Sequence, residues 1–443
     1  MFPDAGAGNG YHHQHQTEGS SSAALADSKL RSTRTRRRRR RRSGGGGGGA
    51  SLDRIEESGR FINFAAGGYG QDRHQQDEEK PPPPCTEFDM AYFHSYAHLG
   101  IHEEMIKDRV RTDTYRAAIM QHQSAIAGKV VVDVGCGTGI LSIFCAQAGA
   151  ERVYAVDASD IAVQAREVVK ANNLSDRVIV LHGRVEDVEI DEEVDVIISE
   201  WMGYMLLYES MLGSVITARD RWLKPGGLIL PSHATLYMTP ITNTDRYAAS
   251  VDFWRDVYGI DMSAMVPLAK QCAFEEPCIE TITGENVLTW PHVVKHVDCY
   301  TVTAEELESV TTRYSFKSMM RAPLHGFAFW FDVEFSGPLP SSNNNYTAPS
   351  FVETSSNQMA VGGQKKKRTS PADSLMLSTA PEDPPTHWQQ TMIYFYEPIE
   401  LEQDQLISGS LTLSQSKENR RFMNIHLEYA TGGRSFVKES VMR

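Results

Sequence analysis

The hydrophobic positions between residues 129 and 230 come in short apolar runs, separated by stretches with helical periodicity. Each apolar run has the length of a buried strand, and the stretches between them repeat apolar residues three and four positions apart. In chain order we expect a helix over Glu103–Gln121, a strand VVVDV, a glycine loop, a helix ILSIFCAQAG, a strand RVYAVD, a helix over Asp160–Asn172, strands RVIVLHG and VDVIISE, a helix near Glu209–Trp222 and a strand GGLIL. Strands that alternate with helices at this spacing predict a mainly parallel, doubly wound α/β sheet of the Rossmann-like kind.

The pattern changes after Pro231, where apolar and polar residues begin to alternate one by one. Alternation of period two is typical of antiparallel strands with one buried face. It is seen in the runs ATLYMTPI and HVVKHVDCYTV, which predict a mostly antiparallel second domain; HGFAFWFDVEF and TMIYFY are also strand-like. An aromatic-rich segment at about residues 243–265 is predicted to be helical.

Two stretches are of low complexity and interrupt these patterns. Residues 1–85 contain the run Arg36–Arg42 followed by a block of glycines, and residues 341–379 are rich in Ser, Asn and Pro around the cluster Lys365–Arg368. Such compositions bury too little apolar surface to offset the entropy lost on ordering. We therefore expect a disordered basic tail, a cofactor-binding domain over 86–230, and a second domain over 231–443 that contains a disordered insertion.

The formal net charge of −13 is distributed unevenly along the chain. Ten of the 44 Lys and Arg but only three of the 57 Asp and Glu lie in residues 1–50, so the remainder holds 34 basic and 54 acidic side chains. An acidic body favours a cationic partner and limits direct nucleic-acid binding to the basic tail. Six cysteines without a CxxC pair favour a reducing compartment. No signal peptide or membrane span is expected.

The glycine loop carries the first candidate site. Gly135, Gly137 and Gly139 follow a strand and open a helix, where the backbone must turn tightly and approach a ligand. The next strand ends in Asp157, which is placed to accept the ribose hydroxyls of an adenosine ligand. With GxGxG in place of the longer dinucleotide fingerprint, the pattern favours S-adenosylmethionine over NAD. Glu186, after the following strand, is a candidate acceptor for the adenine amino group; a solvated loop glutamate is the alternative.

The second candidate site follows the strand VDVIIS. Glu200 and Glu209 stand nine residues apart near the carboxyl end of that strand, where ligands of open α/β sheets bind. A hairpin loop would bring both carboxylates around one cation, and a guanidinium relieves their mutual repulsion by bidentate pairing. The carboxylates would concentrate its charge on one nitrogen and leave the other more nucleophilic. A pair of exposed loop acids is the alternative.

Three motifs carry a resemblance to a known family: SEWMGYMLLYESML, YFHSYAHLGIHEEMIKDRVRTDTYR and the tripeptide Thr386–Trp388. Together they resemble the protein arginine methyltransferase family, in particular its type I branch and the sixth subtype of plants. The resemblance covers Glu87–Gly337 and Glu382–Arg443. It implies a β-barrel-like second domain, S-adenosylmethionine as methyl donor with S-adenosylhomocysteine as product, and monomethyl and asymmetric dimethylarginine in histones and Gly/Arg-rich proteins. No metal is expected.

The resemblance also implies a role for each matching residue. Cofactor contacts are implied for His102, Arg111, Gly135, Gly137, Asp157 and Glu186, with Arg111 pairing the donor's carboxylate. The catalytic group comprises the two glutamates and a proton-carrying pair, Glu200, Glu209, Asp108 and His387. The arginine pocket is implied to be lined by Tyr92, Tyr96, Met105, Met211 and Trp388. Asp157 stands where the family commonly has glutamate, so we expect an altered geometry there.

Simpler roles are open for several of these residues. The methionines fit an ordinary core, His102 a structural histidine, and Trp388 packing between the domains. The helical segment at 243–265 matches the family's dimerisation arm and implies a homodimer; a helical cap on the barrel is the alternative. Two basic clusters favour the nucleus. The competing function classes are a small-molecule or nucleic-acid methyltransferase and a non-catalytic arginine-peptide reader, but the paired glutamates argue against the first and the complete motif set against the second.

Overall fold

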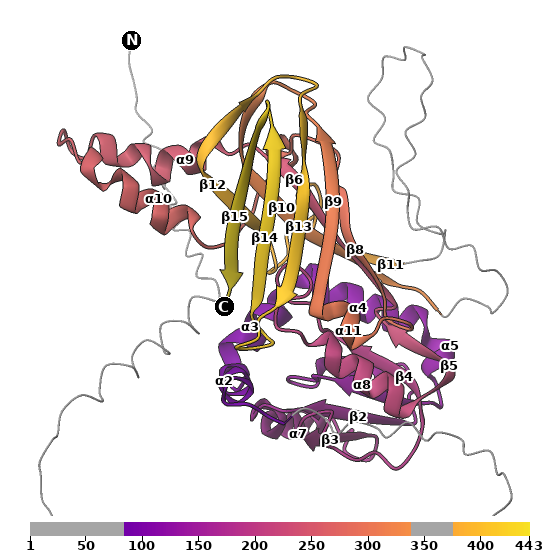
Figure 1. The fold of residues 1–443 in the computed structure, drawn as a ribbon. Helices are drawn as coiled ribbons and strands as arrows, with labels where there is room; N and C mark the ends of the chain where they lie inside the picture. The colour runs from indigo at the N-terminus through magenta and orange to yellow at the C-terminus, as the bar shows by residue number, and fades with distance from the viewer. Residues whose placement is uncertain (1–83, 338–374) are drawn as a thin grey trace, which may run out of the picture. The chain divides into compact units, whose positions relative to one another are not determined.

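The structure is a computed structural model that describes residues 84–337 and 375–443. Its first part is built on a parallel sheet (Figure 1). Its strand order is β3-β2-β1-β4-β5, and every neighbouring pair is parallel. The strands are β1 (Val130–Val134), β2 (Arg152–Asp157), β3 (Val178–His182), β4 (Val194–Ser199) and β5 (Leu223–Leu230). Because β1 lies at the centre and is buried along its whole length, its sequence is a nearly continuous apolar run. The predicted doubly wound sheet is confirmed.

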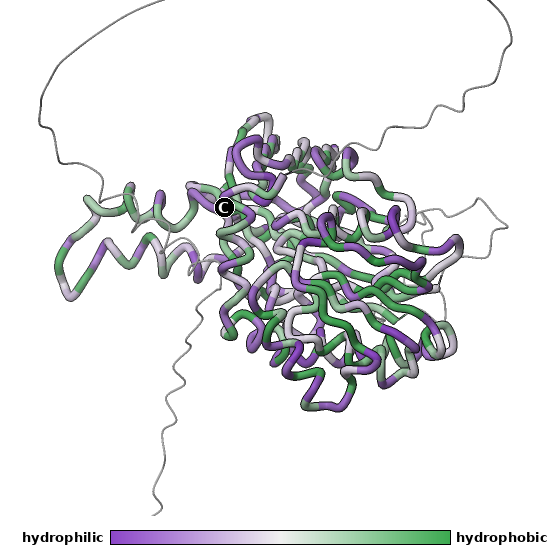
Figure 2. The backbone as a smooth tube through the Cα atoms, turned by 90° about the horizontal axis from the view of Figure 1, so that it is seen from below, coloured by the Kyte–Doolittle hydropathy of each residue, from purple (hydrophilic) through white to green (hydrophobic). Residues whose placement is uncertain are grey.

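Three helices connect these strands: α6 (Ile140–Gln147), α7 (Ile161–Ala171) and α8 (Leu212–Trp222). Helices α6 and α7 pack on β1 to β3, and α8 packs on β4 and β1. Since the strand order runs in opposite directions from β1 and from β4, right-handed crossovers place α6 and α7 on one face and α8 on the other. Figure 2 shows hydrophobic strand segments between more hydrophilic loops. The reversal between β1 and β4 marks the edge where a ligand is expected.

The helices before the sheet differ from the prediction. A single helix over Glu103–Gln121 is wrong: the structure has α2 (Glu87–Tyr96), α3 (Leu99–Lys107), α4 (Arg109–Gln121) and α5 (Gln123–Ile126). Asp108 separates α3 from α4 with an extended backbone, ψ 96°. Its carboxylate accepts the backbone N–H of Arg111 and caps α4, and aspartate is among the preferred residues at this position.

The second part of the structure is antiparallel and curls into a barrel-like arrangement (Figure 1). One sheet has the order β7-β12-β10-β6-β8, with β11 on β10, and the other has the order β15-β14-β13-β9. The strands are β6 (His233–Ile241), β7 (Cys278–Glu280), β8 (His292–Asp298), β9 (Ser309–Lys317), β10 (Ala322–Phe335), β11 (Leu375–Ser378), β12 (Gln390–Leu401), β13 (Leu406–Gln415), β14 (Met423–Thr431) and β15 (Arg434–Met442). Helix α11 (Ala304–Glu308) precedes β9, and a 3-10 turn, η3 (Gly284–Asn286), precedes β8. The four predicted strand runs are confirmed.

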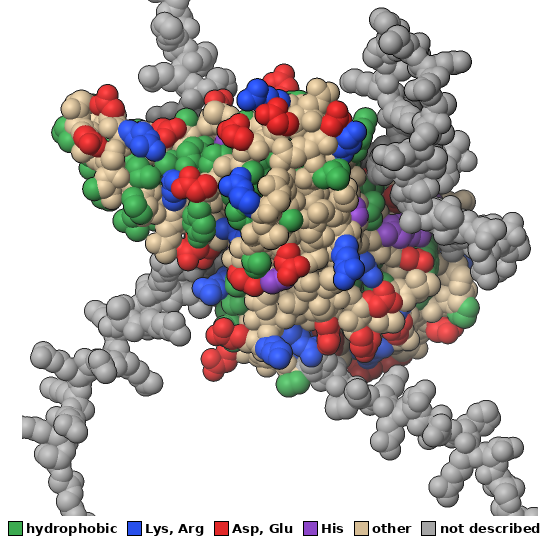
Figure 3. Space-filling view, turned by 45° about the horizontal axis from the view of Figure 1, so that its top comes forward, with side chains coloured by type: hydrophobic (Ala, Val, Ile, Leu, Met, Phe, Trp, Pro, Cys, Tyr) green, Lys and Arg blue, Asp and Glu red, His purple; other side chains and the backbone are tan. Residues whose placement is uncertain are grey.

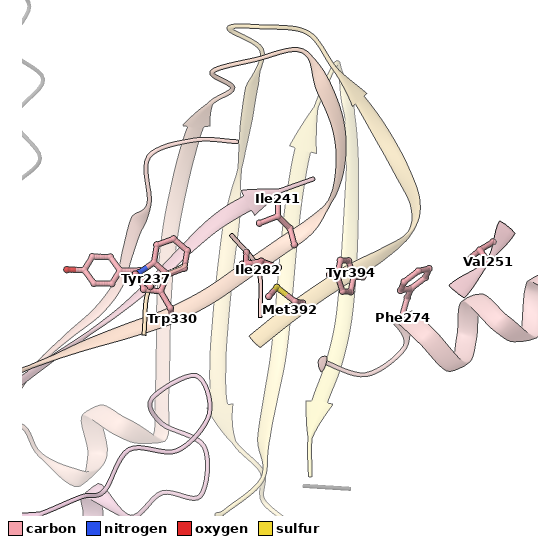
Figure 4. Packing of buried hydrophobic residues seen from close by; sticks show 10 residues of the cluster. Tyr237, Ile241, Val251, Phe274, Ile282, Trp330, Met392 and Tyr394 are labelled. Carbon is pink, nitrogen blue, oxygen red and sulfur yellow. The ribbon is translucent and has the colours of Figure 1, made fainter. Parts of the chain in front are cut away.

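A helical arm projects from the barrel strands (Figure 1). It consists of α9 (Thr244–Ser250), η1 (Asp252–Arg255), η2 (Ser263–Met265) and α10 (Val266–Phe274). The predicted helical segment at 243–265 therefore ended too early, because α10 continues it. Figure 4 shows how the arm is anchored: Val251 and Phe274 extend a buried cluster that continues through Tyr394 and Met392 to Trp330 in the barrel.

Several predictions concern residues outside the described ranges. These are the tail, with its arginine run and glycines, and most of the 341–379 insertion, with its lysine cluster. Its last residues are described, and they correct the prediction: Leu375–Ser378 form β11, which pairs with β10 from Asp332 to Phe335. In the described part of the chain no helix is long and apolar enough to cross a membrane.

Candidate active site

The glycine loop after β1 is held in a conformation that favours glycine. Gly135, Gly137 and Gly139 have φ angles of +74°, +55° and +84°. A Cβ on Gly135 would lie 2.1 Å from Cε of Met211, and a Cβ on Gly137 would lie 3.0 Å from Nδ1 of His102. The structure thus brings two predicted site residues, Met211 and His102, directly against the loop. An added methyl group at either position would fill the space beside the loop. The glycines therefore leave room for a cofactor to approach the backbone closely.

The two predicted adenosine-binding acids lie at or after the carboxyl ends of the neighbouring strands β2 and β3. Asp157 ends β2, and its Oδ2 accepts the N–H of Gly137 at 2.8 Å, while its Oδ1 accepts the N–H and hydroxyl of Ser159 at 2.8 and 2.6 Å. Glu186 follows β3 and accepts the hydroxyl of Ser214 at 2.7 Å. The shorter acid at position 157 therefore ties β2 to the glycine loop. The ligand contacts expected of both acids stay predictions.

The segment between the two glutamates forms the hairpin that their spacing predicts. Glu200 directly follows β4, and an antiparallel bridge joins Gly203 to Leu206 within the loop. At its far end Glu209 and Ser210 have φ angles of +73° and +57°, which are uncommon for residues with a side chain. The chain therefore turns sharply at Glu209.

Glu200 pairs with a buried arginine of α4. Its Oε2 accepts hydrogen bonds from Nε of Arg111 at 3.0 Å and from Nη2 at 2.9 Å. Both side chains are buried: that of Arg111 is 7 % exposed and that of Glu200 is 9 % exposed. The other carboxylate oxygen accepts the N–H of Met202. Arg111 also donates to the carbonyl oxygen of Met105 on α3. The partner that the structure gives to Arg111 is thus Glu200, and the predicted contact with a donor carboxylate is untested.

Glu209 lies among phenol groups of α2. The hydroxyls of Tyr92 and Tyr96 each donate to Oε2 of Glu209 at 2.8 Å, and their rings lie 4.7 Å apart between centroids. Burial raises the pKa of Glu209, while the two hydroxyls and the guanidinium of Arg421 act in the opposite direction. Burial also raises the pKa of both tyrosines far above the usual range, so they remain donors. The two predicted pocket tyrosines therefore meet the predicted catalytic acid.

His387 and Asp108 form a pair between the barrel and the first helices. Oδ2 of Asp108 accepts both the backbone N–H of His387, at 2.9 Å, and Nδ1 of its ring, at 2.7 Å. Burial alone would raise the pKa of Asp108, but the hydrogen bonds from His387 and from the N–H of Arg111 bring it below its usual value. The pair lies on a solvent-open cavity of about 430 Å³, whose lining also includes Glu104, Lys107, Arg109, Val110 and Pro385.

Trp388 connects the barrel to the glutamate hairpin. Its indole N–H donates to the carbonyl oxygen of Met202 at 2.9 Å, and its ring lies 4.0 Å from the ring of His387. The side chain is buried, 3 % exposed. The structure thus shows the packing role between the two parts that was the alternative for this residue, and its role in lining an arginine pocket stays a prediction.

One residue at the site has no counterpart in the predictions. Arg421, in the turn between β13 and β14, donates from Nη1 to the carbonyl oxygen of Glu209 at 2.9 Å across a separation of 212 residues. The surrounding letters, ENRRF, have no periodicity or motif that marks one arginine over the other. Among the described residues, no group of three or more His, Cys, Asp and Glu is arranged to hold a metal ion.

Comparisons with known proteins agree with this geometry. Residues 232–351 and 366–434 match the arginine methyltransferase oligomerization subdomain, and residues 117–232 match the ribosomal protein L11 methyltransferase family. The probable protein arginine N-methyltransferase 6 of Arabidopsis thaliana is 76 % identical over 376 residues, which cover 84 % of this chain and 86 % of that protein.

Solved structures are similar as well. The Trypanosoma brucei PRMT1 enzyme–prozyme heterotetrameric complex with AdoHcy has a TM-score of 0.65 and 33 % identity, covering 79 % of this chain and all of that one. The protein arginine methyltransferase 10 of Arabidopsis thaliana, in an open conformation, has a TM-score of 0.64 and 36 % identity, covering 80 % of this chain and all of that one.

Proposed function

The chain belongs to the protein arginine methyltransferase family and resembles its sixth subtype, and on that premise we propose that it is a type I enzyme. It transfers methyl groups from S-adenosylmethionine to arginine guanidino nitrogens, giving monomethylarginine and then asymmetric dimethylarginine. Its substrates are histones and Gly/Arg-rich proteins. The observation that carries the proposal is the hairpin that presents Glu200 and Glu209 beside the glycine loop, with Glu209 held by two tyrosines.

The cofactor is S-adenosylmethionine, and the residues around the glycine loop fit it. Six residues would hold it. His102 and Arg111 lie on α3 and α4, and the other four lie at or after the carboxyl ends of β1 to β3: Gly135, Gly137, Asp157 and Glu186. When bound, it supplies an electrophilic methyl group on a sulfonium centre. The glycines leave room for close backbone contact, and the two acids offer oxygens for hydroxyl and amino groups.

The two glutamates supply the charge that a guanidinium requires. A bound cation between them favours the ionised form of Glu209, adding to the effect of the tyrosine hydroxyls. Paired with two carboxylates, the guanidinium concentrates its positive charge on one nitrogen and leaves the other with a freer lone pair. Asp108 and His387 then carry the departing proton to solvent, since they lie on an open cavity.

Product geometry is limited by Met211 and Met105. Met211 contacts Gly135 of the loop, and the backbone carbonyl oxygen of Met105 on α3 accepts a hydrogen bond from Arg111. Side chains of this size next to the transfer site restrict which nitrogen can approach a second time, which favours the asymmetric product. Mass spectrometry of a glycine–arginine-rich peptide after turnover tests this; symmetric dimethylarginine, or a methylated base or lipid as product, would overturn the assignment.

The catalytic proposal is tested by Glu200→Gln and Glu209→Gln. Each change leaves a bound guanidinium with one carboxylate, an imperfectly neutralised buried charge that costs roughly 3–5 kcal/mol. We expect methylation to be abolished while S-adenosylhomocysteine still binds. Glu151→Gln, at an exposed position before β2, is the matched control and should retain activity. Near-normal turnover in both site variants would remove the basis of the mechanism.

The arm lies within the match to the oligomerization subdomain, and we propose that the chain forms a homodimer through it. Its exposed apolar side chains support this: Phe253, Tyr258, Ile260 and Leu268 are each more than half exposed. Figure 3 shows hydrophobic side chains gathered on this part of the surface. Light scattering should give a dimer mass for the full chain and a monomer mass for Phe253→Asp combined with Leu268→Asp; an unchanged mass would contradict the proposal.

We also propose a nuclear location, which rests on the two basic clusters of the sequence. Deleting residues 1–50 should shift a fluorescently tagged chain out of the nucleus while leaving turnover on peptides intact. A deletion variant that stays nuclear would contradict the location signal. Loss of turnover would show that the tail takes part in catalysis.

A further inference from the structure

Arg421 joins the barrel to the turn that carries Glu209. The two residues exchange backbone and side-chain hydrogen bonds: Nη1 of Arg421 donates to the carbonyl oxygen of Glu209 at 2.9 Å, and the N–H of Glu209 donates to the carbonyl oxygen of Arg421 at 3.2 Å. The next residue, Ser210, donates its hydroxyl to the carbonyl oxygen of Arg420 at 2.7 Å. The β13–β14 turn is therefore hydrogen-bonded to two consecutive residues at the end of the hairpin.

The same guanidinium also holds helix α2. It lies 3.9 Å from the ring centroid of Tyr92 and 5.1 Å from that of Phe93, and its Nε donates to Oδ1 of Asp89 at 2.9 Å. The Arg421 side chain is 18 % exposed, so these contacts are largely shielded from solvent. A planar guanidinium that stacks on an aromatic face while its edge donates two hydrogen bonds uses features that lysine lacks.

These contacts meet at a turn whose backbone is strained. Glu209 and Ser210 both have positive φ, and a non-glycine residue in that region costs about 1–2 kcal/mol unless its surroundings fix it. The carboxylate of Glu209 depends in turn on α2, because Tyr92 and Tyr96 are its hydrogen-bond donors. Arg421 is bonded to both halves of that arrangement.

We propose that Arg421 is a positioning residue for methyl transfer: it fixes the Glu209 turn and the tyrosines of α2 relative to each other, so that the carboxylate is aimed at the incoming arginine. The proposal rests on the role given to Glu209 above. Arg421 does not need to touch substrate, since its contacts are to the backbone of Glu209 and to side chains of α2.

The charges that face Glu209 make the proposal measurable. The charged groups are Arg421 on the barrel turn and Glu200 after β4, and the neutral hydroxyls of Tyr92 and Tyr96 on α2 donate hydrogen bonds to Glu209. The tyrosine hydroxyls and the Arg421 charge favour the ionised carboxylate, whereas burial and Glu200 disfavour it. Removing the Arg421 charge therefore raises the pKa of Glu209 further.

The test compares Arg421→Gln, Arg421→Lys and Arg420→Gln in the full chain, with a glycine–arginine-rich peptide as substrate. Arg420 is exposed and contributes its backbone carbonyl to the turn, so its variant is the matched control. For Arg421→Gln we expect a rise of at least fivefold in the peptide KM and an acid limb of the kcat/KM profile at higher pH. The affinity for S-adenosylhomocysteine should stay within twofold. Arg421→Lys keeps the charge, so its acid limb should stay in place while KM rises.

Three results would overturn the proposal. The first is an Arg421→Gln enzyme with the peptide KM and pH profile of Arg420→Gln, measured while Glu209→Gln is inactive; this leaves the role of Glu209 standing. The second applies if Arg421→Gln does not fold: an Arg421→Lys enzyme with a wild-type KM then refutes the positioning role. A lower kcat with unchanged KM and unchanged acid limb, proportional to the fraction of folded enzyme, indicates a structural role and also counts against it.

Discussion

The contact of Gly135 with Met211 predicts the cost of adding one methyl group to the glycine loop. In Gly135→Ala the new Cβ would lie 2.1 Å from Cε of Met211, and the backbone would keep a φ of +74°. The left-handed backbone costs an alanine about 1–2 kcal/mol. Moving the end of the Met211 side chain off its rotamer costs roughly 0.5–1.5 kcal/mol more. We therefore expect a loss of about 1.5–3.5 kcal/mol in the free energy of unfolding.

A second glycine separates the two contributions. Gly226 has a φ of +77° with no atom within 4 Å of its added Cβ, so Gly226→Ala carries the backbone cost alone. The double variant Gly135→Ala, Met211→Ala, compared with Met211→Ala, should return to that smaller cost. Urea unfolding measures the free energies. Isothermal titration with S-adenosylhomocysteine should show at least a tenfold weaker affinity for Gly135→Ala and no change for Gly226→Ala.

The reasoning would be refuted by a Gly135→Ala chain as stable as Gly226→Ala. That outcome would mean that the Met211 side chain does not rest on the loop, and that its place beside the transfer site is wrong. A double variant that recovers no stability relative to Met211→Ala would lead to the same conclusion, because the contact would then contribute nothing beyond the backbone cost.

Three further predictions follow from hydrogen bonds of site residues. Burial alone would raise the pKa of Asp108, but its hydrogen bonds bring it below the usual value. The stability that these bonds contribute is therefore lost as pH falls through the pKa of the folded state, and Asp108→Asn should flatten the pH dependence of the unfolding midpoint in the acid range. Trp388→Phe leaves the carbonyl oxygen of Met202 without its indole donor, and urea unfolding should show a loss of about 1–2 kcal/mol. Tyr96→Phe removes a donor that lowers the pKa of Glu209, so the acid limb of kcat/KM for peptide methylation should move to higher pH.

The parts of the site that follow strands could be predicted from the sequence. The glycine loop, Asp157 and the hairpin between Glu200 and Glu209 are determined by neighbours in the chain: an apolar strand, a turn and a helix start. The parallel order of the strands then brings their carboxyl ends together, whichever residues follow them. Local pattern was sufficient there.

The parts that depend on distant residues could not be predicted. The break between α3 and α4 lies at Asp108, whose carboxylate binds His387, 279 residues further along the chain. Periodicity alone indicates an unbroken helix there. Asp108 is a favoured helix cap, but its bond to His387 has no local signal. Arg421 is a similar case. Its hydrogen bond to Glu209 depends on the position of the β13–β14 turn, which is set only when the barrel folds.

The pairing of β11 with β10 has a practical consequence. Phe335 and Leu375 are register partners, so the chain leaves and re-enters the sheet at adjacent positions. The described segments on either side of residues 338–374, which end at Gly337 and start at Leu375, therefore lie together at the end of β10. A position of this kind accepts changes in length without a shift of strand register, and it is a natural place to insert a reporter domain or to open new termini by circular permutation.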